Sequence, residues 1–519
     1  MKLNYKRTIF VGFAFFLICT FWQAYDTIIS KILTDKFGMA QAASGIVMAL
    51  DNILALFLLP LFGSISDRCT SKRGRRTPFI LVGTIIACVA FVCLSFADNL
   101  QHQNIAAVAE IDDPAGLSVL YDNAYETALK TPDGEDFVLR ERFSREEFTA
   151  ITAQIGQDGK LVTNPDYANY VVPARHAYAW QRTQANPTPL IVFMGILFIA
   201  LLAMATFRSP AVALMPDVTI KPLRSKANAV INLMGTAGGI LILGLGMVFS
   251  TGSIKNALMS YTAFFSIVAG IMLAALIVFL LKVREPQFVE EMHAESEKYR
   301  LDAASDHAQP GEKRRLSAGE RTSLLLILAS VVFWFFGYNA VTSKYSVYAS
   351  KVLSLDYNST LMIANVAAIL SYLPVGFVAS RIGRKKTILC GVVMLGAAFF
   401  VASFLREGSS ALLMNCMFAL AGIGWATINV NSFPMVVELS RGGDVGKYTG
   451  FYYTASMAAQ TVTPYVSGLL MDRIGMTTLF PYATAFVALA FLTMLFVRHG
   501  DSRPLPAKDR LESLGGAGD

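Results

Sequence analysis

The sequence predicts an all-α membrane protein with twelve transmembrane helices in two pseudo-symmetric six-helix halves. Of the 519 residues, 54% are hydrophobic and only 16% are charged, whereas a soluble globular domain carries about 25% charged residues. Apolar runs of about 20 residues, the length that crosses a bilayer as a helix, recur along the chain. Because a helix satisfies its own backbone hydrogen bonds inside lipid, these runs favour a helical membrane fold. A basic loop pattern that occurs twice divides the helices into two sets.

The apolar runs define the predicted spans in chain order. They are 9–33, 42–64, 78–97, 189–215, 226–250, 257–282, 322–348, 358–379, 386–405, 409–437, 449–471 and 478–497. Two polar segments interrupt them, at 98–188 and at 283–321. The predicted organisation is a first half at 1–282 that contains the insert 98–188, a linker at 283–321, a second half at 322–497 and a tail at 498–519.

Lysine and arginine gather in alternate short loops, and this pattern predicts orientation because cytoplasmic loops carry the excess of both. The loop after the second span has Arg68, Lys72, Arg73, Arg75 and Arg76, and the loop after the eighth has Arg381, Arg384, Lys385 and Lys386. Both termini and the linker are therefore predicted in the cytoplasm of a multi-pass plasma-membrane protein, with the insert outside. The net charge of +7 is assigned to these loops, since no basic surface with interleaved aromatics indicates nucleic-acid binding.

The insert is predicted to contain two short amphipathic helices. One starts near Gly116 in GLSVLYDNAYETALK, and the other is SREEFTAITAQIG, which Ser144 and Glu147 would begin as a capping box. The pattern is compatible with an insert that covers the outer surface without acting in transport, and with an insert that gates the substrate path. The first of these is the simpler expectation.

The two halves share a loop motif. The loop after the second span reads GSISDRCTSKRGRRT and the loop after the eighth reads GFVASRIGRKKT. This doubled pattern resembles the major facilitator superfamily, whose loop motif is Gly-x-x-x-Asp-Arg-x-x-Gly-Arg-Arg, and SDRCTSKRGRRTPFILVG resembles the sucrose and glycoside–cation symporters within it. The resemblance implies alternating access with the substrate held between the halves. The residues assigned to conformational change are Gly63, Asp67, Arg68, Gly74, Arg75, Arg76, Asp217, Arg381, Gly383, Arg384 and Glu438.

Asp67 has no acidic counterpart in the second loop, where Ser380 takes its place. We expect Asp67 to lie at the N-terminus of a neighbouring helix or to pair with an arginine across the cytoplasmic face, and so to hold the outward-open state. The second half is expected to lack that latch.

Three charges fall inside predicted spans of the first half: Asp26, Asp51 and Arg208. Charges within a membrane are costly and mark functional candidates. Our hypothesis is that Asp26 or Asp51 pairs with Arg208 and that substrate hydroxyls or a proton compete for the pair. A pair that only fixes helix packing is the alternative.

The coupling residues of the resembled families do not transfer to this chain. In the resembled sucrose symporters, an acidic residue stands near the position that is Leu201 here, and an arginine at the position that is Val212. In the melibiose-type glycoside–cation symporters, which TSKRGRRTPFILVG also resembles, the carboxylates that bind the cation fall at Ala55 and Leu59. Proton coupling would therefore have to use Asp26 or Asp51, and facilitated diffusion stays open.

Polar and aromatic side chains recur in the spans that line the cavity in the resembled superfamily. Amides and charged groups bind sugar hydroxyls, and aromatic rings cover the apolar sugar face. The predicted substrate-binding residues are Gln23, Tyr25, Asp26, Arg208, Asn232, Asn339, Trp425 and Asn429.

These features predict a monomeric secondary transporter for a disaccharide or small oligosaccharide, moving with a proton. The alternatives are an exporter of amphipathic small molecules and a sugar uniporter. An enzyme is not expected, because the sequence lacks a GxxxxGK[ST] phosphate loop, an HExxH zinc motif and a nucleophile elbow. No metal, cofactor or catalytic residue is predicted, and the bilayer and a sugar are the expected partners.

Overall fold

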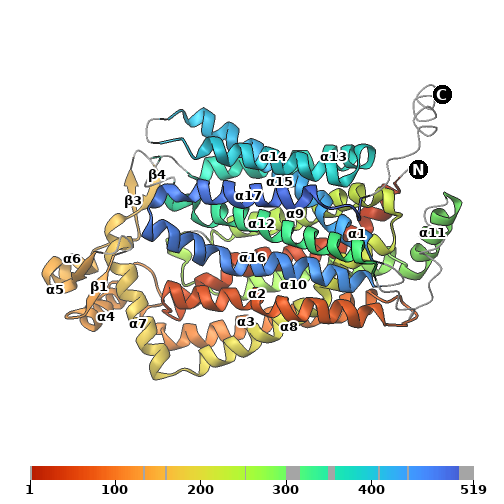
Figure 1. The fold of residues 1–519 in the computed structure, drawn as a ribbon. Helices are drawn as coiled ribbons and strands as arrows, with labels where there is room; N and C mark the ends of the chain where they lie inside the picture. The colour runs from red at the N-terminus through yellow and green to blue at the C-terminus, as the bar shows by residue number, and fades with distance from the viewer. Residues whose placement is uncertain are drawn as a thin grey trace.

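The fold is a bundle of long, roughly parallel helices with a small folded insert at one end (Figure 1). A computed structural model describes residues 3–131, 135–157, 160–251, 253–299, 316–348, 353, 357–406, 409–440 and 444–501. The first six bundle helices are α1 (Tyr5–Ala24), which continues as the π-helical stretches Tyr25–Ile29 and Ile32–Lys36, α2 (Gln41–Asp67), α3 (Thr77–Asn104), α8 (Thr188–Asp217), α9 (Arg224–Val248) and α10 (Thr262–Lys282). The second six are α12 (Ala318–Tyr348), α13 (Tyr357–Ile382), α14 (Arg384–Ala402), α15 (Ala411–Glu438), α16 (Val445–Arg473) and α17 (Leu479–Leu495).

The apolar runs give rise to these helices. Ten helices in the described part of the chain are long and apolar enough to cross a membrane. The 29-residue α16 and the shorter, apolar α17, with 17 residues, complete the predicted set. Pro78 and Pro189 stand in the first turns of α3 and α8, where the missing N–H of proline removes no helical hydrogen bond.

Equivalent helices pack against each other in the two groups of six. In the first group α1 packs against α9 and α10, α8 against α2 and α3, and α3 against α10. In the second group the equivalent pairs are α12 with α16 and α17, α15 with α13 and α14, and α14 with α17. The pseudo-symmetric fold predicted from the repeated loop is therefore present.

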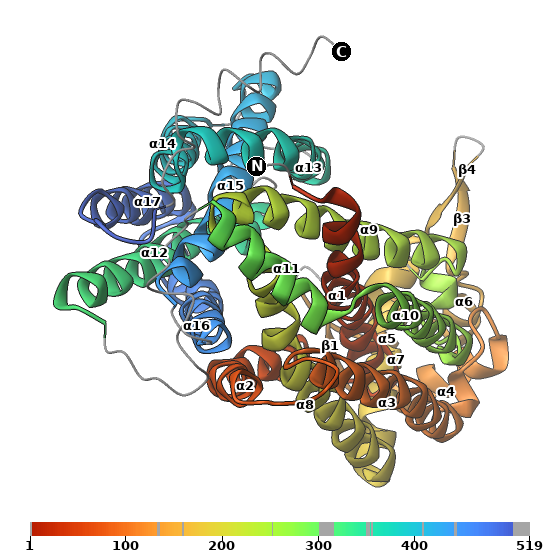
Figure 2. The same cartoon turned by 90° about the vertical axis from the view of Figure 1, so that its right-hand side faces the viewer.

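The groups meet along two pseudo-equivalent helix pairs, α2 with α16 and α13 with α9, as Figure 2 shows from the end of the bundle that carries the two repeated loops. We refer to this end as the motif end and to the other as the insert end. At the first crossing, a Cβ on Gly63 would collide with the carbonyl oxygen of Gly446. At the second, a Cβ on Gly376 would lie 3.0 Å from the Cβ of Ala229. Glycine thus allows close approach at both crossings.

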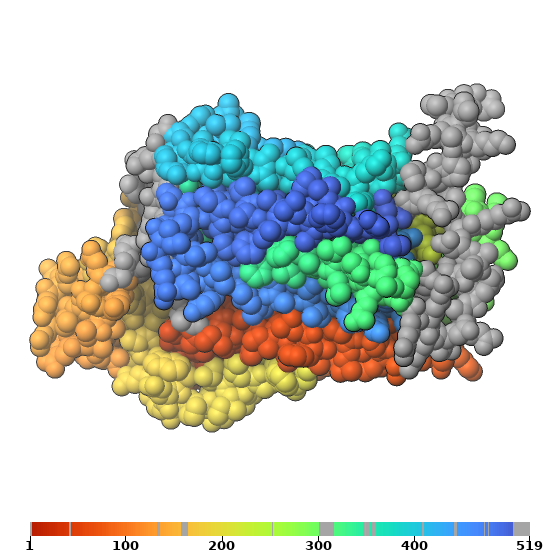
Figure 3. All heavy atoms as spheres, viewed as in Figure 1, coloured from red at the N-terminus to blue at the C-terminus, as the bar shows by residue number. Residues whose placement is uncertain are grey.

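The insert folds around its own hydrophobic core and projects from the bundle (Figure 3). Its elements are α4 (Pro114–Ala124), the hairpin of β1 (Ala128–Lys130) and β2 (Asp136–Val138), α5 (Leu139–Arg142), α6 (Arg145–Thr149), the hairpin of β3 (Gln154–Gln157) and β4 (Lys160–Thr163), the π-helical stretch Tyr167–Val171 and α7 (Val172–Ala185).

Two predictions about the insert need correction. The predicted helices are shorter than expected, because α4 ends at Ala124 and α6 at Thr149, and strands β1 and β3 follow them. The capping box of Ser144 and Glu147 is present. The insert also begins later than Asp98, since α3 continues to Asn104. The reason is a buried ion pair: the Asp98 carboxylate lies 2.7 Å from Nζ of Lys36 and neither side chain is exposed.

The linker is partly helical. Helix α11 (Glu285–Lys298) crosses the motif end beside α1, and Arg7 of α1 lies 3.0 Å from Glu291. The predicted tail lies outside the described residues from residue 502 onward.

Candidate functional site

The three predicted intramembrane charges come from different helices of the first half. Asp26 lies in the π-helical stretch Tyr25–Ile29, a local distortion that is frequent at functional sites. Its side chain is exposed, whereas Asp51 on α2 and Arg208 on α8 are half-buried. The charges lie near enough to interact electrostatically, Arg208 with both carboxylates and the carboxylates with each other.

The direct ion pair predicted for Arg208 is not formed. Among the described residues, its guanidinium has no carboxylate at ion-pair distance. It lies instead 5.2 Å from the ring centre of Trp22 on α1 and 5.0 Å from that of Tyr453 on α16. Both distances suit a cation–π contact. Because Trp22 and Tyr453 belong to opposite halves, Arg208 bridges the halves through aromatic rings.

Several polar atoms keep unused hydrogen-bonding capacity, three around this cluster and one on α12 of the other half. Within the part of the chain that the structure describes, the Tyr25 hydroxyl, Arg208 Nε, Trp22 Nε1 and Asn339 Nδ2 are buried without a hydrogen-bond partner. Buried polar groups are normally satisfied, so these four donors are suited to a polar ligand. Sequence reasoning named three of them, and Trp22 and Tyr453 were missed as partners of Arg208.

The second half contributes an aromatic pair. Trp425 on α15 stacks on Tyr338 of α12 with ring centres 3.8 Å apart and planes 2° apart, and Phe335 meets Trp425 edge-on at 5.1 Å. Asn429 lies one turn beyond Trp425, and its carbonyl accepts a hydrogen bond from Asn228. The second half therefore presents a flat aromatic surface next to amide groups.

The remaining predicted ligands are less well placed. Asn232 uses its amide nitrogen within α9, where it donates to the carbonyl of Asn228 at 2.8 Å. Gln23 is half-buried, and a Cβ on Gly239 would lie 3.5 Å from its Oε1. Asn228 instead links the halves, because Nδ2 donates to the carbonyl of Val430 at 2.8 Å.

Apolar packing surrounds the positions at which the resembled families carry coupling groups. Leu201, Val212, Ala55 and Leu59 are all buried. No titratable side chain replaces a coupling group at these four places, which leaves Asp26 and Asp51 as the carboxylates near the cluster. No group of three His, Cys, Asp or Glu in the described residues could hold a metal ion.

The motif of the first half forms a buried charge network at the motif end. Arg75 donates to both oxygens of Asp217 at 2.7 and 3.1 Å, and Arg76 donates to Asp217 at 2.8 Å and also to Asp67. The Arg76 side chain is fully buried. A bidentate arginine–carboxylate pair is among the stronger polar contacts, so this network fixes the ends of α2, α3 and α8 together.

Asp67 lies where one of our two expectations placed it, at the N-terminus of a helix from the other half. Its two oxygens accept hydrogen bonds from the backbone N–H groups of Gly446 and Lys447 at 2.9 and 3.0 Å. These residues form the first turn of α16, where unpaired N–H groups and the helix dipole attract an anion. Asp67 also pairs with Arg76, which belongs to its own loop and not to the opposite side of the motif end as the second expectation had it.

Sequence reasoning missed Glu285, which starts α11. Its buried carboxylate accepts hydrogen bonds from the N–H groups of Arg75, Arg76 and Thr77 at 2.8, 2.9 and 2.8 Å, and so caps α3. Gly74 has φ +103°, and a Cβ there would collide with this carboxylate. The available signal was an acidic residue directly after the last apolar run of the first half.

The second half repeats this cap with Asp501. Its carboxylate accepts hydrogen bonds from the N–H groups of Arg384 and Lys385 at 2.6 and 3.2 Å, and Gly383 beside it has φ +93°. Arg384 Nη1 donates to Glu438 at 2.7 Å, as Arg75 does to Asp217. Asp501 had been assigned to the tail, without a role.

The second half has no acidic latch at Ser380, in line with the expectation, but it reaches across to the first half through Arg384 instead. Arg384 donates to the Ser225 hydroxyl at 3.1 Å and to the carbonyl of Lys221. Arg224 of the first half lies 3.6 Å from Glu438. Ser380 itself donates to the carbonyl of Phe377 in its own helix. Of the other motif residues, Arg68 and Arg381 are exposed, which suits a role in orientation.

The chain is similar to known transporters over different lengths. A family model described as Major Facilitator Superfamily matches residues 177–371 and 354–516, and one described as MFS/sugar transport protein matches residues 10–108. Sucrose transport protein SUT3 of Oryza sativa subsp. indica is 36% identical over 65 residues, which are 12% of this chain and 13% of the relative. The match thus spans a small part of the curated relatives.

Solved structures share the fold over nearly the whole chain. FucP, a transporter in the outward conformation, has a TM-score of 0.58 at 11% identity and covers 95% of this chain and 98% of its own. A bacterial homologue of the iron transporter ferroportin in an outward-facing state has a TM-score of 0.59 at 11% identity, covering 95% and 99%. The bundle is thus shared by FucP, a fucose:proton symporter, and by a homologue of an iron transporter, so the bundle alone does not identify a substrate.

Proposed function

Because the chain belongs to the major facilitator superfamily, we propose that it is a secondary transporter that moves a glycoside, a disaccharide or small oligosaccharide, together with a proton. In this proposal the motif end and both termini face the cytoplasm, and the insert faces the outside of the plasma membrane. The substrate site lies between the halves, at the cluster around Arg208.

The observation that carries the proposal is the chemistry of this cluster. The first half contributes Arg208 and two carboxylates. The second half contributes Tyr453, which lies against Arg208, and a stacked pair of aromatic rings, Tyr338 on Trp425. Charged planar groups bind adjacent sugar hydroxyls through paired hydrogen bonds, and rings cover the apolar face of the sugar. A cavity for amphipathic compounds would need fewer charges, so this arrangement favours a sugar over the exporter alternative.

The coupling step proposed here uses the electrostatic link between Asp26, Asp51 and Arg208. Protonation of one carboxylate would remove a negative charge beside the guanidinium and change how strongly it is held over Trp22 and Tyr453. Since Tyr453 belongs to α16, proton binding would then act on a contact between the halves. The sugar uniporter remains the second candidate, because Leu201 and Val212 replace the coupling groups of the resembled sucrose family.

Alternating access would require the contacts at the motif end to open. Two hydrogen bonds join the halves there: a backbone N–H of α16 donates to Asp67, and Arg384 donates to Ser225. These contacts close the motif end in the present structure, which suits a state open toward the insert end. Release of both contacts would let the halves rock about the substrate.

Uptake of radiolabelled sucrose and maltose into proteoliposomes tests the proposal, with and without an inward proton gradient. We expect gradient-driven uptake that Asp26→Asn and Arg208→Gln reduce at least tenfold, while the exposed Arg68→Gln serves as the matched control and retains activity. Failure of a panel of glycosides to enter would overturn the sugar assignment. Uptake that is independent of the gradient would reject symport and select the uniporter.

A further inference from the structure

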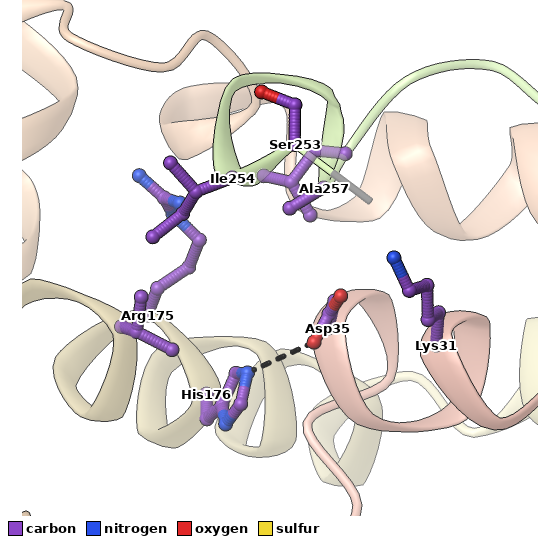
Figure 4. A pocket seen from close by; sticks show the side chains of 9 residues that line it. Lys31, Asp35, Arg175, His176, Ser253, Ile254 and Ala257 are labelled. Atoms are coloured by element: carbon purple, nitrogen blue, oxygen red, sulfur yellow. Dashed lines mark hydrogen bonds and ion pairs between the residues drawn. The ribbon is translucent and has the colours of Figure 1, made fainter. Parts of the chain in front are cut away.

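A pocket of about 310 Å³ lies at the insert end, between the insert and the bundle (Figure 4). Its walls come from the outer end of α1, from α7 of the insert and from the loop before α10. The lining residues are Lys31, Asp35, Val172, Arg175, His176, Ser253, Ile254, Ala257 and Leu258. We refer to it as the insert pocket.

Arg175 supplies a buried cation to this pocket. Its side chain is only 3% exposed, and its Nε has no hydrogen-bond partner among the described residues. The guanidinium donates to the Tyr167 hydroxyl and stacks on that ring at 5.3 Å. Burial raises the pKa of the Tyr167 hydroxyl, so the hydroxyl stays neutral and does not compensate the charge of Arg175.

The other charges of the pocket leave an excess of positive charge. Lys31 donates to the carbonyl of Thr251, which is also neutral. Asp35 is the single carboxylate of the lining; it accepts a hydrogen bond from the Thr34 hydroxyl at 3.1 Å and lies 3.3 Å from Nε2 of His176. Figure 4 shows Lys31 and Asp35 on one side of the pocket and Arg175 on the other. Two basic side chains thus line the pocket with one carboxylate, and burying a charge without a partner is costly.

We propose that the insert pocket binds a small organic carboxylate about the size of one sugar ring. One negative charge on the ligand balances the excess cation, and the carboxylate accepts a hydrogen bond from Arg175, whose Nε is unpaired among the described residues, while Lys31 adds positive charge from the other side. Val172, Ile254 and Leu258 provide an apolar wall for the body of the ligand. The volume is at the lower end of the range of ligand pockets, about 300–1,000 Å³, which fits one ring. This site is separate from the Arg208 cluster and does not depend on the function proposed for it.

Calorimetric titration of the full chain in detergent tests the proposal with three probes: glucuronate, glucose as its neutral counterpart, and inorganic phosphate. We expect saturable binding of glucuronate and none of glucose. Lys31→Gln and Arg175→Gln should weaken glucuronate binding at least tenfold. The matched control is Lys255→Gln. Lys255 lies in the loop before α10 that forms one wall of the pocket, but it is not a lining residue and lies 4.0 Å from Asp112.

Equal binding of glucuronate and glucose, or binding of neither, would overturn the inference. Binding of phosphate without glucuronate would also overturn it and would assign a phosphate site instead. If a variant fails to fold, hydrogen exchange of the unmodified chain decides: glucuronate should protect 172–179 and 253–258, and unchanged exchange there rejects the site. Sugar uptake is a separate measurement, so either proposal can fail alone.

Discussion

The two halves build their motif ends on one plan but reach across to each other with opposite charges. In each half an arginine binds the carboxylate that ends a helix, Arg75 to Asp217 and Arg384 to Glu438. In the first half, the Asp67 carboxylate then accepts hydrogen bonds from N–H groups of α16. The second half uses the Arg384 guanidinium to donate to the carbonyl of Lys221. The repeat therefore specifies the scaffold of each half, while each cross-contact is specified separately.

The largest expected effect is the loss of Arg76, which would break the buried network on which the first half depends. Arg76→Ala leaves Asp67 and Asp217 without their buried partner, and removing one member of a buried pair costs about 3–5 kcal/mol. Denaturant unfolding in detergent measures this loss. Arg75→Ala is the control, because Arg75 is partly exposed and Asp217 keeps Arg76; we expect about 1 kcal/mol. Equal losses of unfolding free energy in the two variants would show that the deeper burial of Arg76 does not make it contribute more to stability than Arg75.

The next effect concerns the Asp67 contact between the halves. Asp67→Ala removes an anion from the N-terminus of α16, an interaction worth up to about 2 kcal/mol when partly buried. The population should shift toward states open at the motif end by about tenfold, since 1.4 kcal/mol is a factor of ten. Spin-label distances across the motif end measure the shift. Ser380→Ala is the pseudo-equivalent control, and an equal shift in it would contradict a special role for Asp67.

The two caps should differ in strength. Glu285→Gln should destabilise the start of α3 by about 1 kcal/mol, and Asp501→Asn should affect the start of α14 less. The reason is that Glu285 is buried with three N–H donors, whereas Asp501 is exposed. Amide hydrogen exchange of residues 79–81 and 386–389 compares the two helices. Faster exchange in the Asp501 variant than in the Glu285 variant would reverse this order.

The smallest effect is expected at the exposed pair Arg68 and Arg381. Arg68→Gln and Arg381→Gln should each change the free energy of unfolding by no more than about 0.5 kcal/mol, because surface substitutions seldom do more. The same unfolding measurement applies. A larger loss at either position would mean that the repeated arginines contribute to the network as well as to orientation.

The sequence predicted the bundle well because hydropathy alone marks a helix that crosses a membrane. The repeated loop indicated Gly63, the arginines and the two helix-ending carboxylates as motif residues, but the pairing of Arg75 with Asp217 and of Arg384 with Glu438 comes from the structure. Glu285 and Asp501 could not be predicted as caps, since each lies more than a hundred residues from the helix that it caps. Asp98 was assigned to the insert because its charge ended an apolar run, and only the fold reveals Lys36 beside it. The cation–π contacts of Arg208 likewise depend on helices that meet only in three dimensions.

The π-helical stretches of α1 set the angle between the side chains that α1 contributes to two different sites. Each wide turn holds more residues than an α-helical turn, so side chains beyond it point in a direction that a regular helix would not give them. Asp26 lies in the first stretch, Lys31 follows it and Asp35 lies in the second. Removing one residue between Asp26 and Lys31 would rotate the outer part of α1 by about 100°. The insert pocket would then lose Lys31 and Asp35 together, while the helix below Asp26 kept its contacts with α9.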